Sequence, residues 1–376
     1  MGDKIQKILR KTFTSAILSI LIGFILGGIV LVIAGYNPFR AYAYLFEGIV
    51  GQPRYIAQTV IFATPIILTS LSVVFAYKTG LFNIGADGQF MMGAVAAAFL
   101  GHYLRLPPII HPIVVIFGAM LVAGVYGGII GLLKARFGIN EVITSIMLNW
   151  IALYFNNYYI NIPGVRKPNT EASWEIQQTA YIRVANSLKF SEEGIQRLAN
   201  GNRFMSDVVL RTDLNYGILI AIAVAVLVWF ILNKTTLGYS LKAVGHNKEA
   251  AEFAGINVKK NIILSMFISG AIAGIAGAVY IMGIAPHRVA ILAFSEQYGF
   301  NGLSVALIGA VHPFGVIFAG LFFGGLRYGS GFLQSRMGVP SEIINIVIGV
   351  IVFFIGISSL FRIIADKIAK NKKGGN

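Results

Sequence analysis

Long apolar stretches constrain this chain more than any other feature of its sequence. A helix needs about 20 largely apolar residues to cross a lipid bilayer, and nine stretches approach or exceed this length. Only 12% of the 376 residues are charged and the mean hydropathy is +0.75, whereas soluble domains carry about 25% charged residues. A soluble enzyme is therefore excluded. The stretches are 12–34, 55–77, 81–101, 109–133, 142–160, 214–232, 262–283, 300–326 and 343–364.

Nine spans would place the two ends of the chain on opposite sides of the membrane. Both ends are basic, and basic segments favour the cytoplasmic side. The stretch 300–326 is interrupted by His312, Pro313, Phe314 and Gly315, a turn-like cluster in which proline removes a helical donor. The sequence therefore predicts an all-α integral membrane protein with about ten transmembrane segments, including a broken helical hairpin at 300–326, and with cytoplasmic N- and C-termini.

The distribution of charge agrees with this topology. The formal net charge is +15, and more than half of the basic residues lie on segments assigned to the inside, so nucleic acid is not the implied partner. The segment 12–34 is longer than the ~7–15 residues of a signal-peptide core, so we interpret it as a retained first helix. The longest external loop, 161–213, is nearly neutral. It is either a linker or a small folded cap, with a short helix near 191–200 that Ser191 would cap.

The sequence predicts no catalytic site, metal site or cofactor. It has no G-x-x-x-x-G-K-[ST] phosphate-binding loop and no cysteine, and its five histidines are scattered. Few charged residues lie within the apolar stretches, although ion-coupled carriers usually need them there. The chain is therefore not expected to be an enzyme, and the energy for transport is expected to come from another subunit.

Two polar segments interrupt the apolar pattern. The first, 79–90, places Asn83 and Asp87 four residues apart, on one helical face, with Gln89 close by. Such side chains are costly at membrane depth unless they are paired or face water. They indicate either a polar lining of a translocation path or an internally satisfied helix cap at the inner interface.

The second polar segment is the loop 233–261, the longest on the predicted cytoplasmic side. Asn247 can cap a short helix over 248–254, which Gly255 would end. With Ala250, Ala251 and Phe253 available for docking, this helix is either a contact for a partner protein or a bare amphipathic helix at the membrane surface.

These residues also carry a family resemblance. Glu249-Ala250-Ala251-x-x-x-Gly255 matches the E-A-A-x3-G loop signature of ABC-transporter permease subunits. The surrounding K-A-V-G-H-N-K-E-A-A-E-F-A-G-I-N-V, together with F-N-I-G-A-D-G-Q and G-L-S-V-A-L-I-G-x-x-x-P-x-G, resembles the permeases for branched-chain amino acids, ribose-type sugars and nucleosides. The resemblance covers roughly residues 55–360 and is closest to the sugar/nucleoside branch. Asp87 stands where that family usually has glutamate.

The resemblance implies that 1–376 is a single transmembrane permease domain of the cytoplasmic (inner) membrane. Its loop 233–261 would dock on a separate ATPase, and it would work with a second permease subunit, identical or different. An external substrate-binding protein or lipoprotein would deliver a nucleoside or a related sugar-like solute. The residues expected to couple to the ATPase are Gly245, His246, Asn247, Glu249, Ala250, Ala251 and Gly255.

The candidate residues of the substrate path are polar or aromatic residues that are expected to lie deep in the membrane. Polar side chains among them would hydrogen-bond hydroxyl groups or a base, and Trp150 or Phe300 would stack on a ring. The alternative is a self-sufficient secondary carrier or channel coupled through Asp87. The path candidates are Asn83, Asp87, Gln89, Asn149, Trp150, Phe300, Asn301 and Ser304.

Overall fold

The computed structural model describes residues 12–202 and 204–357. In this part of the chain the regular structure is helical, and the only β-type pairing is three isolated bridges. The all-α prediction is therefore confirmed for the described residues. The basic residues of the N-terminus and of the C-terminal tail, on which the predicted orientation partly depends, lie outside them.

Five described helices are long and apolar enough to cross a membrane, or six if one bent pair counts as a single span. Each predicted apolar stretch contains at least one helix, but α5 (Ala86–Tyr103), α7 (Glu141–Asn161), α13 (Tyr298–Ile308) and α15 (Ser341–Gly356) fall outside the five. The count of ten segments stays a prediction. The five helices are α4 (Pro53–Tyr77), α6 (Ile110–Phe137), α9 (Gly217–Lys234), α12 (Val258–Gly283) and α14 (Gly315–Met337).

The chain divides into two compact units, and the first combines residues 1–52 with 326–376. Here α2 (Thr12–Ile33) is followed by α3 (Pro38–Val50), a helix that the apolar pattern did not predict, with a bend of 120° between them. Asn37 accepts the backbone N–H groups of Phe39 and Arg40, which satisfies the exposed donors at the start of α3. Gly23 of α2 lies against the backbone of Ile351 in α15, where a Cβ would come within 3.0 Å of its Cα.

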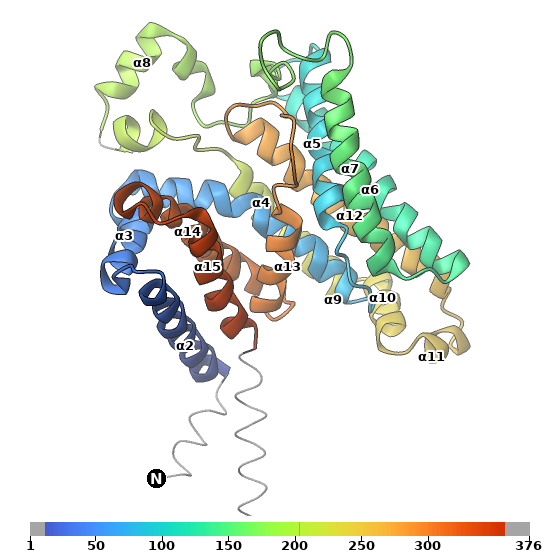
Figure 1. The fold of residues 1–376 in the computed structure, drawn as a ribbon. Helices are drawn as coiled ribbons and strands as arrows, with labels where there is room; N and C mark the ends of the chain where they lie inside the picture. The colour runs from blue at the N-terminus through green and yellow to red at the C-terminus, as the bar shows by residue number, and fades with distance from the viewer. Residues whose placement is uncertain (1–11, 203, 358–376) are drawn as a thin grey trace, which may run out of the picture. The chain divides into compact units, whose positions relative to one another are not determined.

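The second unit, residues 53–325, contains the helices around the candidate site. Its α6 and α12 cross with their backbones in contact (Figure 1). A Cβ on Gly270 would lie 2.4 Å from the carbonyl oxygen of Ala123, and one on Gly274 would lie 2.5 Å from that of Ala119. Small residues allow this approach, so the glycine spacing of the sequence has a packing role.

The predicted break in 300–326 is present, since α13 ends at Ile308 and α14 begins at Gly315. The tripeptide Gly-Ile-Asn occurs at two other helix junctions. Gly138 (φ +70°) and Gly255 (φ +80°) end one helix in the left-handed conformation, and Asn140 and Asn257 then cap the next, α7 and α12. The repeat therefore marks a local stop-and-start signal.

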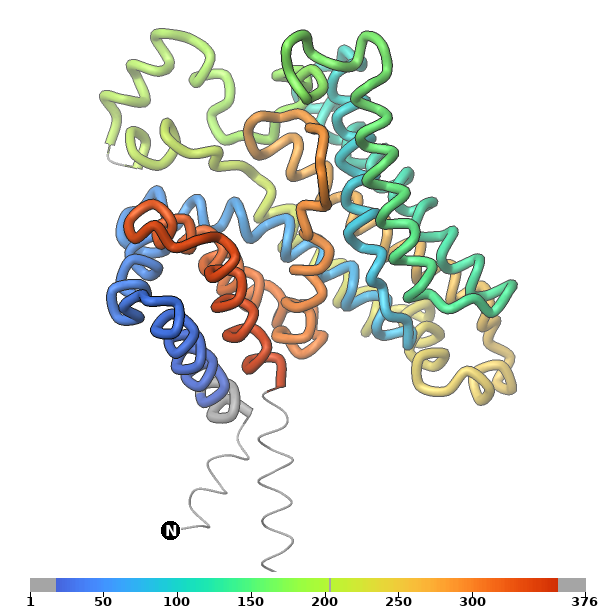
Figure 2. Tube along the Cα trace, in the orientation of Figure 1, coloured from blue at the N-terminus to red at the C-terminus, as the bar shows by residue number. Residues whose placement is uncertain are grey.

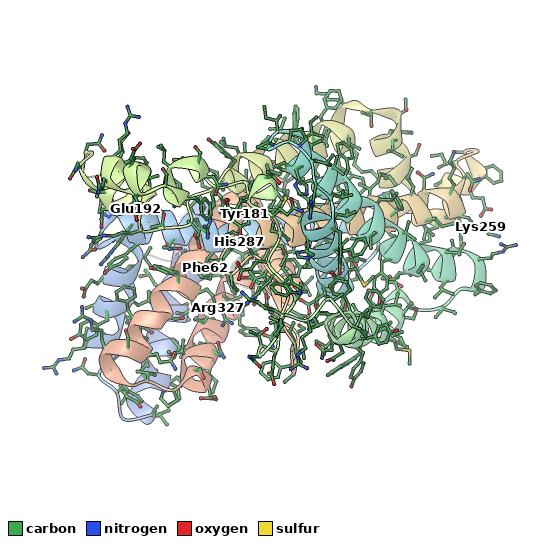
Figure 3. The ribbon with its side chains drawn as sticks, turned by 90° about the horizontal axis from the view of Figure 1, so that it is seen from above. Phe62, Tyr181, Glu192, Lys259, His287 and Arg327 are labelled. Carbon is green, nitrogen blue, oxygen red and sulfur yellow. The ribbon has the colours of Figure 1, made fainter. Side chains whose placement is uncertain are left out.

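The described residues of 162–216 are folded, which favours a small folded cap over a linker for the predicted loop 161–213. It contains η1 (Gln178–Ala180), η2 (Asn186–Phe190), α8 (Glu192–Ala199) and η3 (Phe204–Val209). Ser191 caps α8 through the N–H of Gly194, as predicted. The Tyr181 ring stacks on His287 at 4.0 Å between centroids, and the two lie together in Figure 3. We call 162–216 the cap.

Candidate functional site

The site is formed by α5, α7 and the non-helical segment 284–297 that joins α12 to α13 (Figure 2). Two neighbouring asparagines of α7 hold this segment. Asn157 accepts the N–H of Leu292 at 3.0 Å and donates to its carbonyl at 2.8 Å, while Asn156 donates to Ala290 at 2.9 Å. Side-chain amides of α7 thus satisfy backbone groups of this segment that have no helical hydrogen bonds, and residues 171–176 bond to others of its backbone groups.

Four of the predicted path residues surround one cavity of about 190 Å³, which we call the Trp150 cavity. Asp87 is the charged group at its edge. Its carboxylate accepts hydrogen bonds from the Ser295 hydroxyl and from the backbone N–H of Gly299, the latter at 2.8 Å. The complete lining is Asp87, Ile146, Asn149, Trp150, Leu153, Phe294, Ser295, Gln297 and Phe300.

Asn149 fixes the start of α5 beside this cavity. Its side-chain oxygen accepts the N–H of Gly88 at 2.8 Å and its amide donates to the carbonyl of Ile84 at 3.1 Å. A Cβ on Gly88 would lie 2.8 Å from the Asn149 oxygen, so the close approach needs glycine. Residues 81–85 are not helical, and α5 begins later than the predicted stretch because these contacts replace its first turn.

Asn83 and Gln89 lie beside the Trp150 cavity and are not among its lining residues. Each is fully buried, and their amides bond reciprocally at 2.8 and 3.1 Å. Asn83 also donates to the Ser269 hydroxyl of α12 at 2.6 Å. The pair is thus internally satisfied, but neither side chain caps α5, so the helix cap considered for the segment 79–90 is not formed by these two residues.

The other two path candidates, Asn301 and Ser304, lie on α13 and line neither of the site's cavities. The Ser304 hydroxyl donates to the carbonyl of Phe300 in its own helix at 3.3 Å. Trp150 and Phe300 are partly exposed on the Trp150 cavity, so their rings are accessible for stacking.

A second cavity, of about 140 Å³, was not predicted from the sequence, and we call it the Tyr280 cavity. It continues along the same two helices, since α5 contributes Phe90, Met91 and Ala94 to it after Asp87, and α7 contributes Asn156 after Leu153. The one lining residue that stood out in the sequence was Glu296, because few carboxylates lie near the ends of the apolar stretches. The remaining lining is Tyr280, Ile281, Pro286, Arg288, Val289, Ala290, Leu292 and Glu296.

The predicted partner contact is a helical hairpin formed by α10 (Thr236–His246) and α11 (Lys248–Phe253). The sequence analysis had not resolved α10 as a helix. Asn247 caps α11 by accepting the N–H of Ala250 at 3.0 Å. Phe253 is 98% exposed, whereas Ala251 is buried by this chain itself. Of the other candidate contacts, Gly245 is half-buried, and His246, Asn247, Glu249, Ala250 and Gly255 are exposed.

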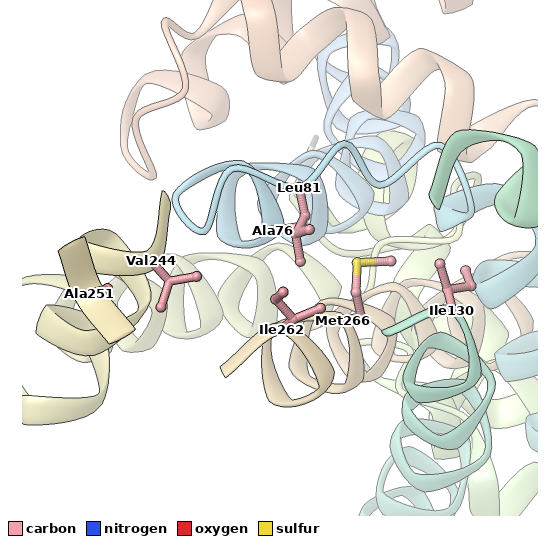
Figure 4. Packing of buried hydrophobic residues seen from close by; sticks show 7 residues of the cluster. All are labelled: Ala76, Leu81, Ile130, Val244, Ala251, Ile262 and Met266. Atoms are coloured by element: carbon pink, nitrogen blue, oxygen red, sulfur yellow. The ribbon is translucent and has the colours of Figure 1, made fainter. Parts of the chain in front are cut away.

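An apolar cluster connects α11 to the turn between α4 and α5 (Figure 4). It joins Ala251 of α11 and Val244 of α10 to the turn between α4 and α5. At that turn the backbones touch, because a Cβ on Gly245 would lie 2.3 Å from the Lys78 carbonyl oxygen. Burial lowers the pKa of Lys78, and the nearby Lys242 adds to this effect. The full cluster is Ala76, Leu81, Ile130, Val244, Ala251, Ile262 and Met266.

Comparison with known proteins places the chain among membrane permeases. The family described as "Branched-chain amino acid transport system / permease component" matches residues 55–356. A guanosine ABC transporter permease protein of Bacillus subtilis is 37% identical over 96% of this chain and 97% of its own length. A nucleoside ABC transporter permease protein of Lactococcus lactis is 37% identical over 98% of this chain and 95% of its own length.

A glucose ABC transporter permease protein of Haloferax volcanii is 29% identical over 97% of this chain and 92% of its own length. No solved structure matches the chain significantly. The matched region contains α4 to α15, and with them the two cavities and the α10–α11 hairpin. This multi-pass membrane protein therefore belongs to the permease-component family of branched-chain amino acid transport systems.

Proposed function

We propose that this chain is the permease subunit of an ATP-driven importer for nucleosides. The observation that carries the proposal is the similarity, over nearly the full length, to a guanosine permease and a nucleoside permease at 37% identity each. The glucose permease relative is less similar, at 29%.

The chemistry of the site supports such a cargo. A nucleoside combines a planar aromatic base with a hydroxylated sugar, so its site needs both rings and hydrogen-bonding groups. The Trp150 cavity offers Trp150 and Phe300 as rings, and Asp87 and Asn149 as polar groups. The two cavities follow successive turns of α5 and α7, which is the arrangement expected for a path along these helices.

We place α11 against a separate ATPase, since it is the exposed, well-capped helix of the loop that carries the E-A-A-x3-G signature. The proposal includes ten transmembrane segments with cytoplasmic termini in the cytoplasmic (inner) membrane. A second permease subunit and an external substrate-binding protein complete the importer. Two relatives from Bacillus subtilis, both named as guanosine permease proteins, support pairing with a paralogue.

Reconstitution tests the function. The chain is placed in proteoliposomes with the proposed ATPase, second permease and binding protein, and uptake of radiolabelled nucleosides is measured with and without ATP. We expect ATP-dependent uptake that vanishes when the ATPase is omitted. Uptake by this chain alone down a proton or sodium gradient would instead establish the carrier coupled through Asp87.

A coupling variant tests the ATPase contact. Glu249→Lys reverses the charge in the first turn of α11, an exposed position where an acidic residue is favoured. We expect the variant chain to fold and to lose association with the ATPase in a pull-down. Unchanged complex formation would contradict the placement of α11.

A further inference from the structure

Glu296 presents a hydrogen-bond acceptor that nothing in the described chain uses. Its Oε1 accepts the Tyr280 hydroxyl at 3.2 Å, but its Oε2 is buried and has no hydrogen-bond partner. A buried acceptor without a partner destabilises the protein, and a carboxylate is more costly than a neutral group. Glu296 lines the Tyr280 cavity, so a rotation of its carboxylate would turn Oε2 toward the cavity, where a donor brought by a ligand would satisfy it.

Aromatic rings form one wall of this cavity. The Phe90 ring lies 5.6 Å from Tyr280 and 4.8 Å from Tyr298, and the two tyrosine rings are 5.2 Å apart. Phe90 and Tyr280 line the cavity directly. Rings of this kind bind planar aromatic ligands face to face or edge to face.

The remaining walls are largely aliphatic, with Met91, Ala94, Ile281 and Val289 among them, and the other polar side chains of the lining are Asn156 and Arg288. The volume of about 140 Å³ is close to the ~150 Å³ of an engineered cavity that admits benzene. A ribose placed here would leave most of its hydroxyl groups against apolar walls, which is unfavourable. A planar heterocycle with polar atoms on one edge fits both the walls and the carboxylate.

We infer that the Tyr280 cavity is the subsite for the nucleobase, with the Glu296 carboxylate accepting N–H donors from the edge of the base. This inference rests on the proposed nucleoside transport and specifies how the cargo is recognised. When it is ionised, the Glu296 carboxylate only accepts hydrogen bonds, and in that form it selects bases that carry adjacent amino and imino hydrogens, as guanine does. It selects against purines that have only acceptors on that edge.

The test measures selectivity in the complete reconstituted importer. Guanosine and purine riboside, which lacks N–H donors on the corresponding edge, compete for uptake of radiolabelled guanosine. We expect the wild-type importer to favour guanosine at least about 10-fold, since a charge-assisted hydrogen bond contributes on this scale. In Glu296→Gln one acceptor oxygen becomes an amide donor, and we expect the preference to fall to about 2-fold or less.

Glu192→Gln is the matched control, because it makes the same chemical change at an exposed position of α8 and should leave the preference as in wild type. If the Glu296→Gln importer does not assemble, Glu296→Asp is the second variant. Its shorter side chain keeps the charge but moves it away from the base, so the same loss of preference for guanosine over purine riboside is expected.

Nucleoside uptake with an unchanged preference in the assembled Glu296 variant overturns the base subsite and leaves the proposed function intact. Absence of ATP-dependent uptake of every nucleoside by the wild-type importer overturns the proposed function itself. A variant that slows guanosine and purine riboside equally would show that Glu296 has only a structural role.

Discussion

The backbone N–H of Gly299 donates a hydrogen bond to the Asp87 carboxylate at 2.8 Å, across 212 positions of sequence. A Cβ on residue 299 would lie 2.1 Å from the backbone nitrogen of Asp87, so only glycine permits this approach. The first turns of α5 and α13 are therefore joined at one point beside the Trp150 cavity. Substitution at Asp87 acts on both helices at once.

Asp87→Ala should destabilise the chain, because the Gly299 N–H and the Ser295 hydroxyl both lose their acceptor. An unsatisfied buried group costs about 1–3 kcal/mol, so a lower unfolding temperature in detergent is expected. Asp87→Asn keeps an acceptor oxygen with nearly the same shape and should retain ATP-driven uptake within a few-fold. Complete loss of uptake in an Asp87→Asn importer that still assembles would favour the carrier coupled through Asp87.

Phe253→Ala should weaken the complex with the ATPase at least about 10-fold in a binding titration. The ring is 98% exposed, so removing it sacrifices no packing within this chain, and its unfolding temperature should stay the same. Aromatic side chains, phenylalanine among them, are enriched in protein–protein interfaces. Phe190→Ala, which removes a half-exposed ring from the cap, provides the control and should bind the ATPase normally.

Gly245→Ala should destabilise the chain by about 1–3 kcal/mol, as overpacking typically does. The added Cβ would meet the Lys78 carbonyl oxygen at 2.3 Å, a backbone atom that cannot move aside cheaply. Gly128→Ala in α6 is the matched helical control, since its nearest neighbour is a Phe267 ring atom at 3.6 Å. It should be neutral or stabilising by up to about 1 kcal/mol. Thermal unfolding of the purified variants compares the two, and equal effects would contradict the tight contact at the α4–α5 turn.

The cap should lose stability as the pH falls from about 6.5 toward 4. Burial lowers the pKa of His287 to about 4, and Arg183 contributes further. Below the ordinary pKa of histidine, His287 binds a proton in the unfolded chain but not in the folded chain, where it is buried against Tyr181 of the cap, and this difference destabilises the folded state only on the acid side. Over this pH range the free energy of unfolding should fall by about 3 kcal/mol. The charged or titratable groups that influence His287 are Arg183, Asp213 and Glu175, and the Tyr181 hydroxyl belongs to the ring stacked on it.

The fluorescence of Trp174, a residue of the cap, can follow thermal unfolding at a series of pH values. His287→Asn is the informative variant, because asparagine tolerates the positive φ of +57° at this position and does not titrate in this range. Its absolute stability is expected to be lower, but the slope between pH 6.5 and 4 should flatten. A slope equal to that of wild type would assign the acid sensitivity to other groups.

Local signals made several elements predictable from the sequence. Ser191 before two glutamates marked α8, and Asn247 with Gly255 marked the ends of α11, because capping depends on residues within one or two turns. The cluster around Pro313 likewise marked the gap between α13 and α14. The α2–α3 bend was missed because α3 is short and its apolar residues are interrupted by Arg40 and Glu47, and a search for long apolar runs does not recognise such a helix.

The site was less predictable, since its contacts join distant parts of the sequence. The polarity of Asn83 and Gln89 indicated that they need partners, but nothing local showed that they pair with each other and with Ser269. Ser295 and Glu296 lie in a segment with no regular periodicity, so the sequence could not place them beside α5. Asn149 and Trp150 were selected by depth and polarity, and their position at the Trp150 cavity depends on how α7 is rotated.

The contact between α6 and α12 restricts how the second unit can deform. Because Gly270 and Gly274 hold the two backbones against each other, neither helix can slide or roll past the other without a steric collision. Because α11 directly precedes α12, a force applied at α11 would consequently move α6 and α12 together as one rigid body. Bending must then occur outside these two helices. Residues 284–297 directly follow α12 and line both cavities, so any displacement of α12 would be transmitted to the lining of both cavities through this segment.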